Sequence, residues 1–535
     1  MTAVPGDSAT SIADVKPAAK TGGAAHVALG ILVSRLFGIV RNMLTASYLG
    51  ATGPADAFQA AFKITNLLQN LFGEGALSAS FIPVYSKLVK KDPEEAGRAA
   101  GAIGAILALA VSIIVLVGII ATPLLIPLIA QGFEDDRREM TIRLTRILFP
   151  GAGLFVISAW CLGILNTHGK FLLSYLAPVF WNIAMIGALL VAGPRQHERD
   201  LATTLAWASV VGAALQFLVQ VPGVLRFDRN LRFSWGTQSS HVRTVVRNFG
   251  PAFVSRGVVQ ISSYIDNWLA SFLPLGMLAT FGYASAIVVL PVSLFGMSIS
   301  AAKLPEMSSA DGNEEEVAAY LRASLTRGLR QIAYFVIPSA AAFLVFGDVI
   351  SALLFQRGKF TAADSRYAWG ILAGAAIGLL ASTMGRLYSS TYYALHDTRT
   401  PLRFALIRVT LTTLLGYLFA LWLPPHIGID AHWGAAGLTA SAGIAGWIEF
   451  YLLRARLNQR IGLTGVPARF ILSLWGSAIV GALAGWEMRG LVQGRGHVVS
   501  GVLVLGTYGV VFLLMTVALG VPEASVALAR LRRRG

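Results

Sequence analysis

The feature that most constrains this chain is a succession of apolar runs, each about 20 residues long, separated by short polar or Gly/Pro-containing breaks. A helix of that length matches the hydrocarbon thickness of a bilayer. Because an unpaired backbone polar group is costly in lipid, a chain with many such runs folds as a bundle of transmembrane helices. We therefore predict an all-α polytopic membrane protein, in agreement with 55% hydrophobic and 13% charged residues.

Counting the runs between polar or Gly/Pro breaks predicts about fourteen transmembrane helices. Residues 1–24 precede the first run and have the small, polar composition of a disordered tail. Residues 126–146 predict an amphipathic helix that lies at the membrane surface. The spans are expected at residues 26–49, 57–87, 99–122, 147–166, 172–192, 201–224, 246–273, 277–307, 327–347, 367–393, 402–423, 432–454, 467–488 and 499–520.

The distribution of Lys and Arg predicts how the bundle is oriented. Basic residues concentrate in the loops that follow even-numbered spans and in the C-terminal RLRRRG, whereas the other loops are short or mixed in sign. Because basic loops stay on the cytoplasmic side, both termini are expected in the cytoplasm. This topology accounts for the formal net charge of +16, so the basic residues do not indicate a nucleic-acid partner.

Short motifs recur at a nearly constant distance, which indicates an internal repeat. The offset is 221 to 224 residues, and an even number of predicted spans separates the copies. The halves therefore share one orientation, and transporters built from parallel repeats bind their substrate between the halves. The pairs are Val33-Ser34-Arg35 with Val254-Ser255-Arg256, Ala46-Ser47-Tyr48-Leu49 with Ala270-Ser271-Phe272-Leu273, Leu71-Phe72-Gly73 with Leu294-Phe295-Gly296, and Pro83 with Pro305.

Charged residues interrupt the first predicted span, at Arg35 and Arg41. A charge at the bilayer centre costs about 2.5–3.5 kcal/mol on insertion scales, so such a residue normally faces a cavity or a partner. Six residues correspond to about 120° around a helix, so both arginines could point into one wide cavity but could not both hold one small ion. The alternative is a structural role, in which each arginine pairs with a carboxylate or a helix end.

The stretch SRLFGIVRN at 34–42, followed by ADAFQAAFKITNLLQNLFGEGALSASFIPVY at 55–85, resembles the MurJ/MviN family of lipid II flippases. Residues 260–305 and YYALHDTRTP at 392–401 are also similar to this family, which belongs to the multidrug/oligosaccharidyl-lipid/polysaccharide exporter superfamily. The resemblance implies two pseudo-symmetric six-helix lobes with two further C-terminal helices, in the bacterial cytoplasmic membrane. It also implies that the protein moves undecaprenyl-diphosphate-linked peptidoglycan precursor to the outer leaflet by alternating access, without covalent chemistry. The parts are then an N-lobe at 25–225, a basic cytoplasmic linker at 226–245, a C-lobe at 246–455, spans 13 and 14 at 456–520, and a basic tail at 521–535.

The resemblance assigns Arg35 and Arg41 to a central cavity, where guanidinium groups suit the diphosphate because they donate bidentate hydrogen bonds and stay charged. It places Asp56 near the outer end of the second span, as an ion-pair partner or a gate. No catalytic residue, metal ligand or organic cofactor is expected. The candidate substrate-binding residues are Arg35, Arg41, Asp56, Asn66, Gln69, Glu74 and Arg386.

Three positions depart from the family pattern. Gln69 and Ala286 stand where arginines are usual, and Thr65 replaces a proline, which removes an expected helix irregularity. Arg386 is an additional cation that could offset Ala286. These losses leave open a different polyprenyl-diphosphate-linked glycan, a drug or ion antiporter, or a non-transporting paralogue with a scaffold role in wall synthesis. A membrane enzyme is disfavoured because no metal-spaced or nucleophilic motif occurs.

Asp266 in the seventh predicted span is a candidate cation-coupling residue, together with Thr412 in the eleventh. A carboxylate there could bind Na⁺ or H⁺, or pair with an arginine such as Arg256 or Arg408. Gly416 stands where sodium-binding family members usually have a polar side chain. The coupling ion is therefore left open between Na⁺ and H⁺, with the membrane potential as a further driving force. We expect a monomer that contacts the lipid-linked substrate and membrane lipids, with cell-wall synthesis proteins as candidate partners.

Overall fold

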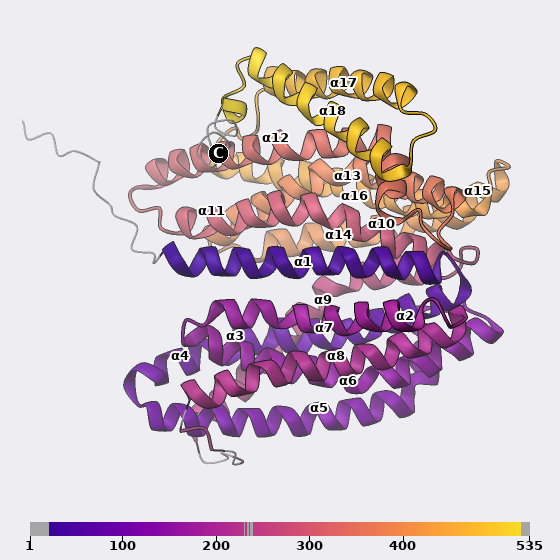
Figure 1. Ribbon diagram of the computed structural model, residues 1–535. Coiled ribbons are helices and arrows are strands. Elements are labelled where there is room, and N and C mark those ends of the chain that lie inside the picture. Colours follow the sequence, from indigo (N-terminus) through magenta and orange to yellow (C-terminus); the bar gives the residue numbers. More distant parts are fainter. Residues whose placement is uncertain (1–20, 229, 233–234, 236–238, 526–535) are drawn as a thin grey trace, which may run out of the picture.

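The computed structural model is a helical bundle with two lobes side by side (Figure 1). It describes residues 21–525 apart from 229, 233–234 and 236–238, and only the backbone of 21–29, 73–75, 227, 251–252 and 254–263. Within this part of the chain every regular element is a helix. Residues 1–20 of the predicted tail and 526–535 of the predicted basic tail lie outside it, and the first helix already begins at Thr21.

The N-lobe is built around α6, which contacts α2, α5 and α8. The predicted surface helix at 126–146 is not a separate element, because α5 ends at Ile129 and the acidic segment forms the first turns of α6. Acidic side chains in a first turn favour a helix start. The helices are α1 (Thr21–Leu49), α2 (Gly53–Leu68), the π-helix η1 (Gln69–Leu77), α3 (Ser78–Ser80), α4 (Ile82–Lys91), α5 (Pro93–Ile129), α6 (Asp135–Thr167), α7 (Phe171–Ala192) and α8 (Glu198–Phe227).

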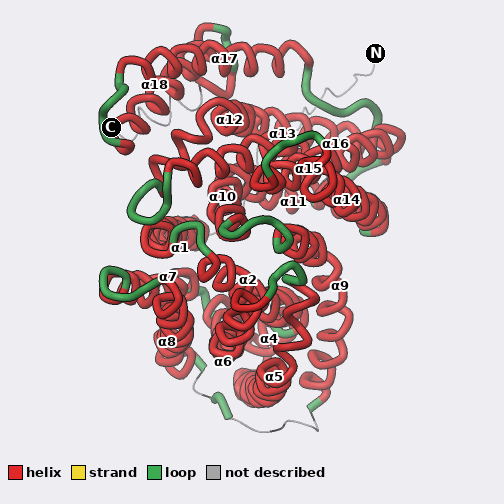
Figure 2. Tube along the Cα trace, turned by 90° about the vertical axis from the view of Figure 1, so that its right-hand side faces the viewer, coloured by secondary structure: helices red, strands yellow, loops and turns green. Residues whose placement is uncertain are grey.

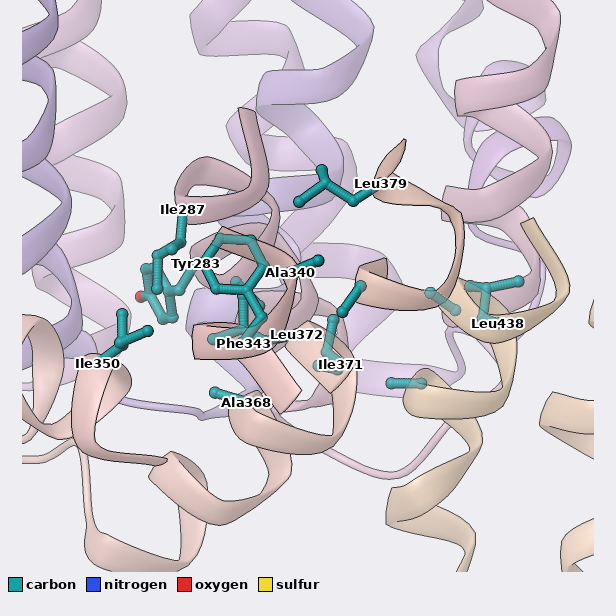
Figure 3. Close-up of a cluster of buried hydrophobic side chains, with 14 of the residues drawn as sticks. Tyr283, Ile287, Ala340, Phe343, Ile350, Ala368, Ile371, Leu372, Leu379 and Leu438 are labelled. Atoms are coloured by element: carbon teal, nitrogen blue, oxygen red, sulfur yellow. The ribbon is translucent and has the colours of Figure 1, made fainter. Parts of the chain in front are cut away.

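The C-lobe is built around α13, which packs along α12 and α16 (Figure 3). Gly378 of α13 meets Gly443 of α16 so closely that a Cβ at Gly378 would lie 2.2 Å from the Gly443 Cα, which explains a glycine at each position. The helices are α9 (Ser240–Ala270), α10 (Met277–Pro291), the π-helix η2 (Val292–Met297), α11 (Ser298–Ser308), α12 (Glu314–Phe355), α13 (Ala362–Ala394), α14 (Arg399–Tyr417), the π-helix η3 (Leu418–Trp422), α15 (Leu423–His426), the 3₁₀ turn η4 (Ala431–Trp433) and α16 (Gly434–Ile461).

Two further helices, α17 (Ala468–Leu491) and α18 (His497–Ala518), lie on the outside of the C-lobe against α12 (Figures 1 and 2). Ion pairs reinforce this contact. Arg330 of α12 binds Glu523 at 2.9 Å, and Arg489 of α17 binds Asp348 of α12 at 2.7 Å.

The internal repeat is visible in the backbone. Both Leu-Phe-Gly motifs, 71–73 and 294–296, lie in π-helical segments, η1 and η2, that interrupt a long helix. The expectation that Thr65 leaves the second span regular is therefore wrong, because the irregularity begins at Gln69 without a proline. A π-helical turn widens the helix and often marks a functional site.

Among the residues that the structure describes, eleven helices are long and apolar enough to cross a membrane by length and composition. The other three predicted spans correspond to α1, to α2 with its π-helical continuation, and to α9, which are the segments that carry Arg35, Arg41 and Asp266. The prediction of fourteen spans therefore requires that these three charged helices also cross the membrane. The predicted linker at 226–245 is shorter than expected, because α8 runs to Phe227 and α9 starts at Ser240.

The turn between α1 and α2 marks one end of the molecule, called here the outer end because the predicted topology places it outside the cytoplasm. It lies on the right in Figure 1 and faces the viewer in Figure 2. The opposite end, with the basic loops, is called the inner end. Helix α9 contacts η1, α3 and α5 of the N-lobe as well as α14 and α16 of the C-lobe, so it joins the two lobes.

Candidate functional site

A cavity of about 560 Å³ lies between the two lobes. Helices α1, α2 and α7 form its N-lobe wall, and α9 and α10 form its C-lobe wall. The cationic side chains among its lining residues are Arg35, Arg41 and Lys63, and all three come from the N-lobe. The structure therefore brings the two predicted arginines into one cavity, at the interface where a parallel repeat predicts a substrate site.

Arg41 is held by neutral groups. Its Nη2 donates to Asn42 Oδ1 at 2.8 Å, its Nη1 donates to Asn182 Oδ1 at 3.3 Å, and its guanidinium carbon lies 4.5 Å from the centre of the Trp181 ring. In the described part of the chain neither Arg41 nor Arg35 forms an ion pair. Amides and an aromatic face orient a guanidinium without neutralising it, so both charges remain available to an anion.

Trp181 is fixed from behind by other N-lobe residues. Its Nε1 donates to Ser209 Oγ of α8 at 3.1 Å, and its ring stacks on Phe62 of α2 with centroids 5.5 Å apart. Phe155 of α6 meets it edge-on. Because three helices hold the indole, the Arg41 guanidinium rests on a rigid surface.

Lys63 is a cavity residue missing from those predicted above. It lies one turn before Asn66, which also lines the cavity as expected. The available signal was its position in the apolar run AAFKITN, because a lysine inside a span is as costly as an arginine. Lys63 Nζ lies 5.8 Å from the Tyr264 ring centre, and the Tyr264 hydroxyl donates to the Lys63 carbonyl at 3.2 Å.

The remaining predicted substrate-binding residues lie elsewhere. Gln69 starts η1 and is not among the lining residues, and Arg386 is exposed on α13, also outside the lining. The side chain of Glu74 lies outside the described residues. Ala286 does line the cavity, beside Ser285 on α10, so the position where the family usually has an arginine faces the site but carries no charge.

Asp56 lies at the closed outer end of the cavity rather than in its wall. Its side chain is fully buried and accepts hydrogen bonds from the backbone N–H groups of Gly276 and Ala279, both at 2.8 Å, at the start of α10. Arg137 Nη1 lies 3.3 Å from the same carboxylate. A carboxylate at a helix N-terminus satisfies free N–H groups and interacts favourably with the helix dipole. Asp56 thus ties the N-lobe to the C-lobe.

The glycine at 276 is required for this contact. Its φ is +83°, and a Cβ there would lie 2.1 Å from the carbonyl oxygen of Ala51. A side chain would therefore separate the α1–α2 turn from α10 and remove the two N–H groups from the reach of Asp56.

Further contacts close the same end. Lys359, between α12 and α13, donates its backbone N–H to the Ser47 carbonyl at 2.8 Å, and its Nζ lies 2.6 Å from Glu198 of the N-lobe. The Gly132 N–H donates to Ser271 Oγ at 3.0 Å. Several independent hydrogen bonds between the lobes therefore hold the outer end shut.

Asp266, the predicted coupling residue, lies on α9 between two cations. Lys63 of the N-lobe and Arg408 of the C-lobe both interact with it electrostatically, and its Oδ1 is buried without a hydrogen-bond partner. Arg408 in turn forms an ion pair with Glu449 of α16, with Nη1 3.0 Å from Oε2. Thr412 is 3% exposed one turn beyond Arg408. Asp266 and Glu449 therefore each have a positively charged side chain of the protein nearby.

Gly416 leaves no space for a larger group. A Cβ at this position would lie 2.9 Å from Leu269 and 3.1 Å from Leu438. Among the side chains that the structure describes, no group of three His, Cys, Asp or Glu residues is arranged to bind a metal ion.

Comparison with known proteins identifies the family. The family model described as "Lipid II flippase MurJ" matches residues 45–506. A Burkholderia cenocepacia protein named lipid II flippase MurJ is 32% identical over 460 residues, which are 84% of this chain and 86% of the relative. A Vibrio cholerae protein named probable lipid II flippase MurJ is 29% identical over 517 residues, which are 91% of this chain and 94% of the relative.

Two solved structures share the fold. A lipid II flippase MurJ in an inward closed conformation superimposes with a TM-score of 0.75 at 23% identity, covering 92% of this chain and 97% of the other. An inward-facing multidrug resistance MATE family transporter of the MOP superfamily gives 0.63 at 16% identity, covering 82% and 98%. These likenesses support the fold, and the family model covers most of the sequence. The chain belongs to the MurJ family of lipid II flippases.

Proposed function

We propose that this protein moves lipid II from the inner to the outer leaflet of the bacterial cytoplasmic membrane, and that the cavity cations hold the diphosphate of the substrate. The observation that carries this proposal is an interlobe cavity in which Arg35 and Arg41 form no ion pair with a described residue. Cations that were structural would be paired, because an unpaired charge is costly at this depth. The family membership supports the same conclusion.

The arginines suit this task because their donors match phosphate geometry. Residues six apart on a helix are separated by about 9 Å along its axis, a distance that two long side chains can bridge to reach adjacent phosphates. Transport of this kind requires no bond making or breaking. The protein acts by binding and by conformational change, so we assign it no enzymatic activity.

We further propose that the chain works by alternating access, as a monomer with both termini in the cytoplasm. The interlobe hydrogen bonds of Asp56 and Lys359 close the outer end and therefore support a substrate that enters from the inner side. Release would require these contacts to break while the inner ends of the lobes approach each other.

The test is complementation of a strain depleted of its own lipid II flippase. We expect the wild-type chain to restore growth, and Arg35→Ala and Arg41→Ala to fail although they are expressed and inserted. A matched control is Arg243→Ala, which removes an exposed arginine at the inner end. Failure of well-expressed wild-type protein would contradict the proposal.

The surroundings of Asp266 bear on whether a sodium ion drives transport. Because Arg408 and Lys63 supply positive charge there, we propose that the carboxylate balances these two cations rather than serving as a sodium ligand. Flipping by reconstituted protein should then proceed at the same rate when K⁺ replaces Na⁺ on both sides. A severalfold loss of rate in K⁺ would contradict this.

Ala286 favours a second candidate, a flippase for another polyprenyl-diphosphate-linked glycan. The residue lines the cavity without the charge that is usual in the family, so the C-lobe wall contacts the substrate differently. If the wild-type chain binds undecaprenyl diphosphate but does not complement lipid II flipping, this candidate replaces the first.

A further inference from the structure

We propose that Lys63 is a third cationic ligand for the substrate diphosphate, and that Asp266 holds it in the empty cavity and releases it when the substrate binds. This inference rests on the proposed function of the same cavity. Lys63 lines the cavity from α2 of the N-lobe, whereas Asp266 lies on α9, next to the lining residue Asn267. The exchange therefore involves both lobes.

Lys63 and Asp266 are near enough to interact through their charges but form no ion pair and no hydrogen bond with each other. The two side chains interact electrostatically, yet neither belongs to an ion pair within the described residues, and Asp266 Oδ1 has no hydrogen-bond partner. An ammonium group carries three donors and needs acceptors at this depth. Lys63 thus has unused hydrogen-bonding capacity that faces the cavity.

The charges of the cavity support the same conclusion. Arg35, Arg41 and Lys63 are positive, and Asp266 is the acid that acts on Lys63. Arg408 forms an ion pair with Glu449, and neither residue lines the cavity. The empty site therefore carries an excess of two positive charges, and a diphosphate diester carries two negative charges. Without Lys63, the two arginines and Asp266 would leave an excess of only one positive charge, which is one fewer than the diphosphate requires.

The position of Lys63 gives the exchange a mechanical consequence. Its carbonyl accepts from Tyr264, two residues before Asp266 on α9, so α2 and α9 already touch at this level. When the diphosphate draws the ammonium away, the attraction between Lys63 and Asp266 weakens and the Tyr264 hydrogen bond remains. Substrate binding thereby loosens the joint between α2 and α9.

The experiment is equilibrium binding of undecaprenyl diphosphate to the purified, full-length protein in detergent. Lys63→Gln should bind about tenfold more weakly, the loss expected for one charge-assisted hydrogen bond. Lys63→Arg, which keeps the charge, should bind within about threefold of the wild type. Asp266→Asn should bind more tightly than the wild type, because the competitor for Lys63 is removed. A structural role for Asp266 would instead weaken binding or leave it unchanged.

The outcomes separate the inference from the proposed function. If the wild type binds and Arg41→Ala does not, but Lys63→Gln and Asp266→Asn both bind like the wild type, the role of Lys63 is refuted and the flippase proposal stands. If the wild type itself does not bind undecaprenyl diphosphate, the proposed function fails and the inference fails with it. Lys90→Gln, which alters an exposed lysine at the inner end, is the matched control. Should Lys63→Gln fail to fold, the sign of the Asp266→Asn effect decides.

Discussion

The cations that line the cavity from the N-lobe and the embedded arginines of the C-lobe differ in their partners. In the N-lobe, Arg35, Arg41 and Lys63 face the cavity and form no ion pair with a described residue. In the C-lobe, Arg408 is paired with Glu449, and Arg386 lies within electrostatic range of the same carboxylate. Both lobes carry copies of the repeated motifs, and the equivalent π-helical segments occur in each. On the proposed function, the paired charges of the C-lobe stabilise that lobe, whereas the unpaired cations of the N-lobe hold the ligand.

The largest expected effect is the loss of flipping rate when an unpaired N-lobe cation is removed. Arg41→Ala should reduce flipping by about 100-fold or more, because two charged hydrogen bonds to phosphate are lost. The measurement is transfer of lipid II across reconstituted vesicles. Arg489→Ala removes a paired arginine from α17 and should leave the rate within about threefold of the wild type. Similar losses in both variants would contradict the contrast between the lobes.

A smaller effect is expected at the outer end, where the lobes meet. Asp56→Asn removes the charge that binds the start of α10 and should shift the equilibrium toward an open outer end by about 10- to 100-fold. The readout is disulfide formation between cysteines that replace Gly53 and Leu275, since a Cβ at Gly53 lies 3.4 Å from the Leu275 side chain. Cross-linking should fall in Asp56→Asn but not in Glu139→Gln, an exposed change at the same end.

Tighter substrate binding is expected when the C-lobe wall of the cavity receives a positive charge. Ala286→Arg should bind undecaprenyl diphosphate up to about tenfold more tightly, because a fourth cation then faces the site. Ala286→Leu supplies bulk without charge and should not improve binding. If Ala286→Arg binds no better than Ala286→Leu, the C-lobe wall does not contact the phosphates.

The smallest expected effect is on the pH dependence of stability, and it arises in the loop between α13 and α14. Partial burial acts to raise the pKa of Asp397, but hydrogen bonds from the Thr400 backbone and hydroxyl, together with the Arg460 charge, outweigh it and hold this pKa below its usual range. The carboxylate therefore stabilises the fold above the pKa it has in the unfolded chain, and this stabilisation is lost as the pH falls through the lowered value. The apparent melting temperature should fall less between pH 6 and pH 3 in Asp397→Asn than in the wild type. Equal decreases would show that the loop contributes nothing.

Sequence reasoning reached the membrane class and the family because apolar run length and a long motif are local properties of the chain. It placed Arg35 and Arg41 correctly in one cavity, since a buried arginine has few alternatives. Asp56 was placed at the outer end, but its partners are backbone N–H groups of Gly276 and Ala279, 220 residues and more away, which no side-chain pattern reveals.

Other features depended on packing that the sequence does not display. The π-helix at Gln69 forms without the proline that would have predicted it. Asp135 and Asp136 suggested a surface helix, yet they start α6, whose central position comes from contacts with α2, α5 and α8. Lys63 was not predicted because it is a single lysine beside a more prominent motif, although the cost of burying a charge in a span applies to it as well.

The excess positive charge of the cavity has an electrical consequence. A cavity that carries two net charges when empty and none when it holds a diphosphate responds to the membrane voltage only in its empty form. Each charge that crosses the whole field gains about 2.3 kcal/mol per 100 mV. On the proposed function and the predicted topology, a negative cytoplasm would draw the empty cavity back toward the cytoplasmic side and would leave the loaded step without electrical work. A sensitivity of the return step to voltage would therefore follow from three side chains and one acid.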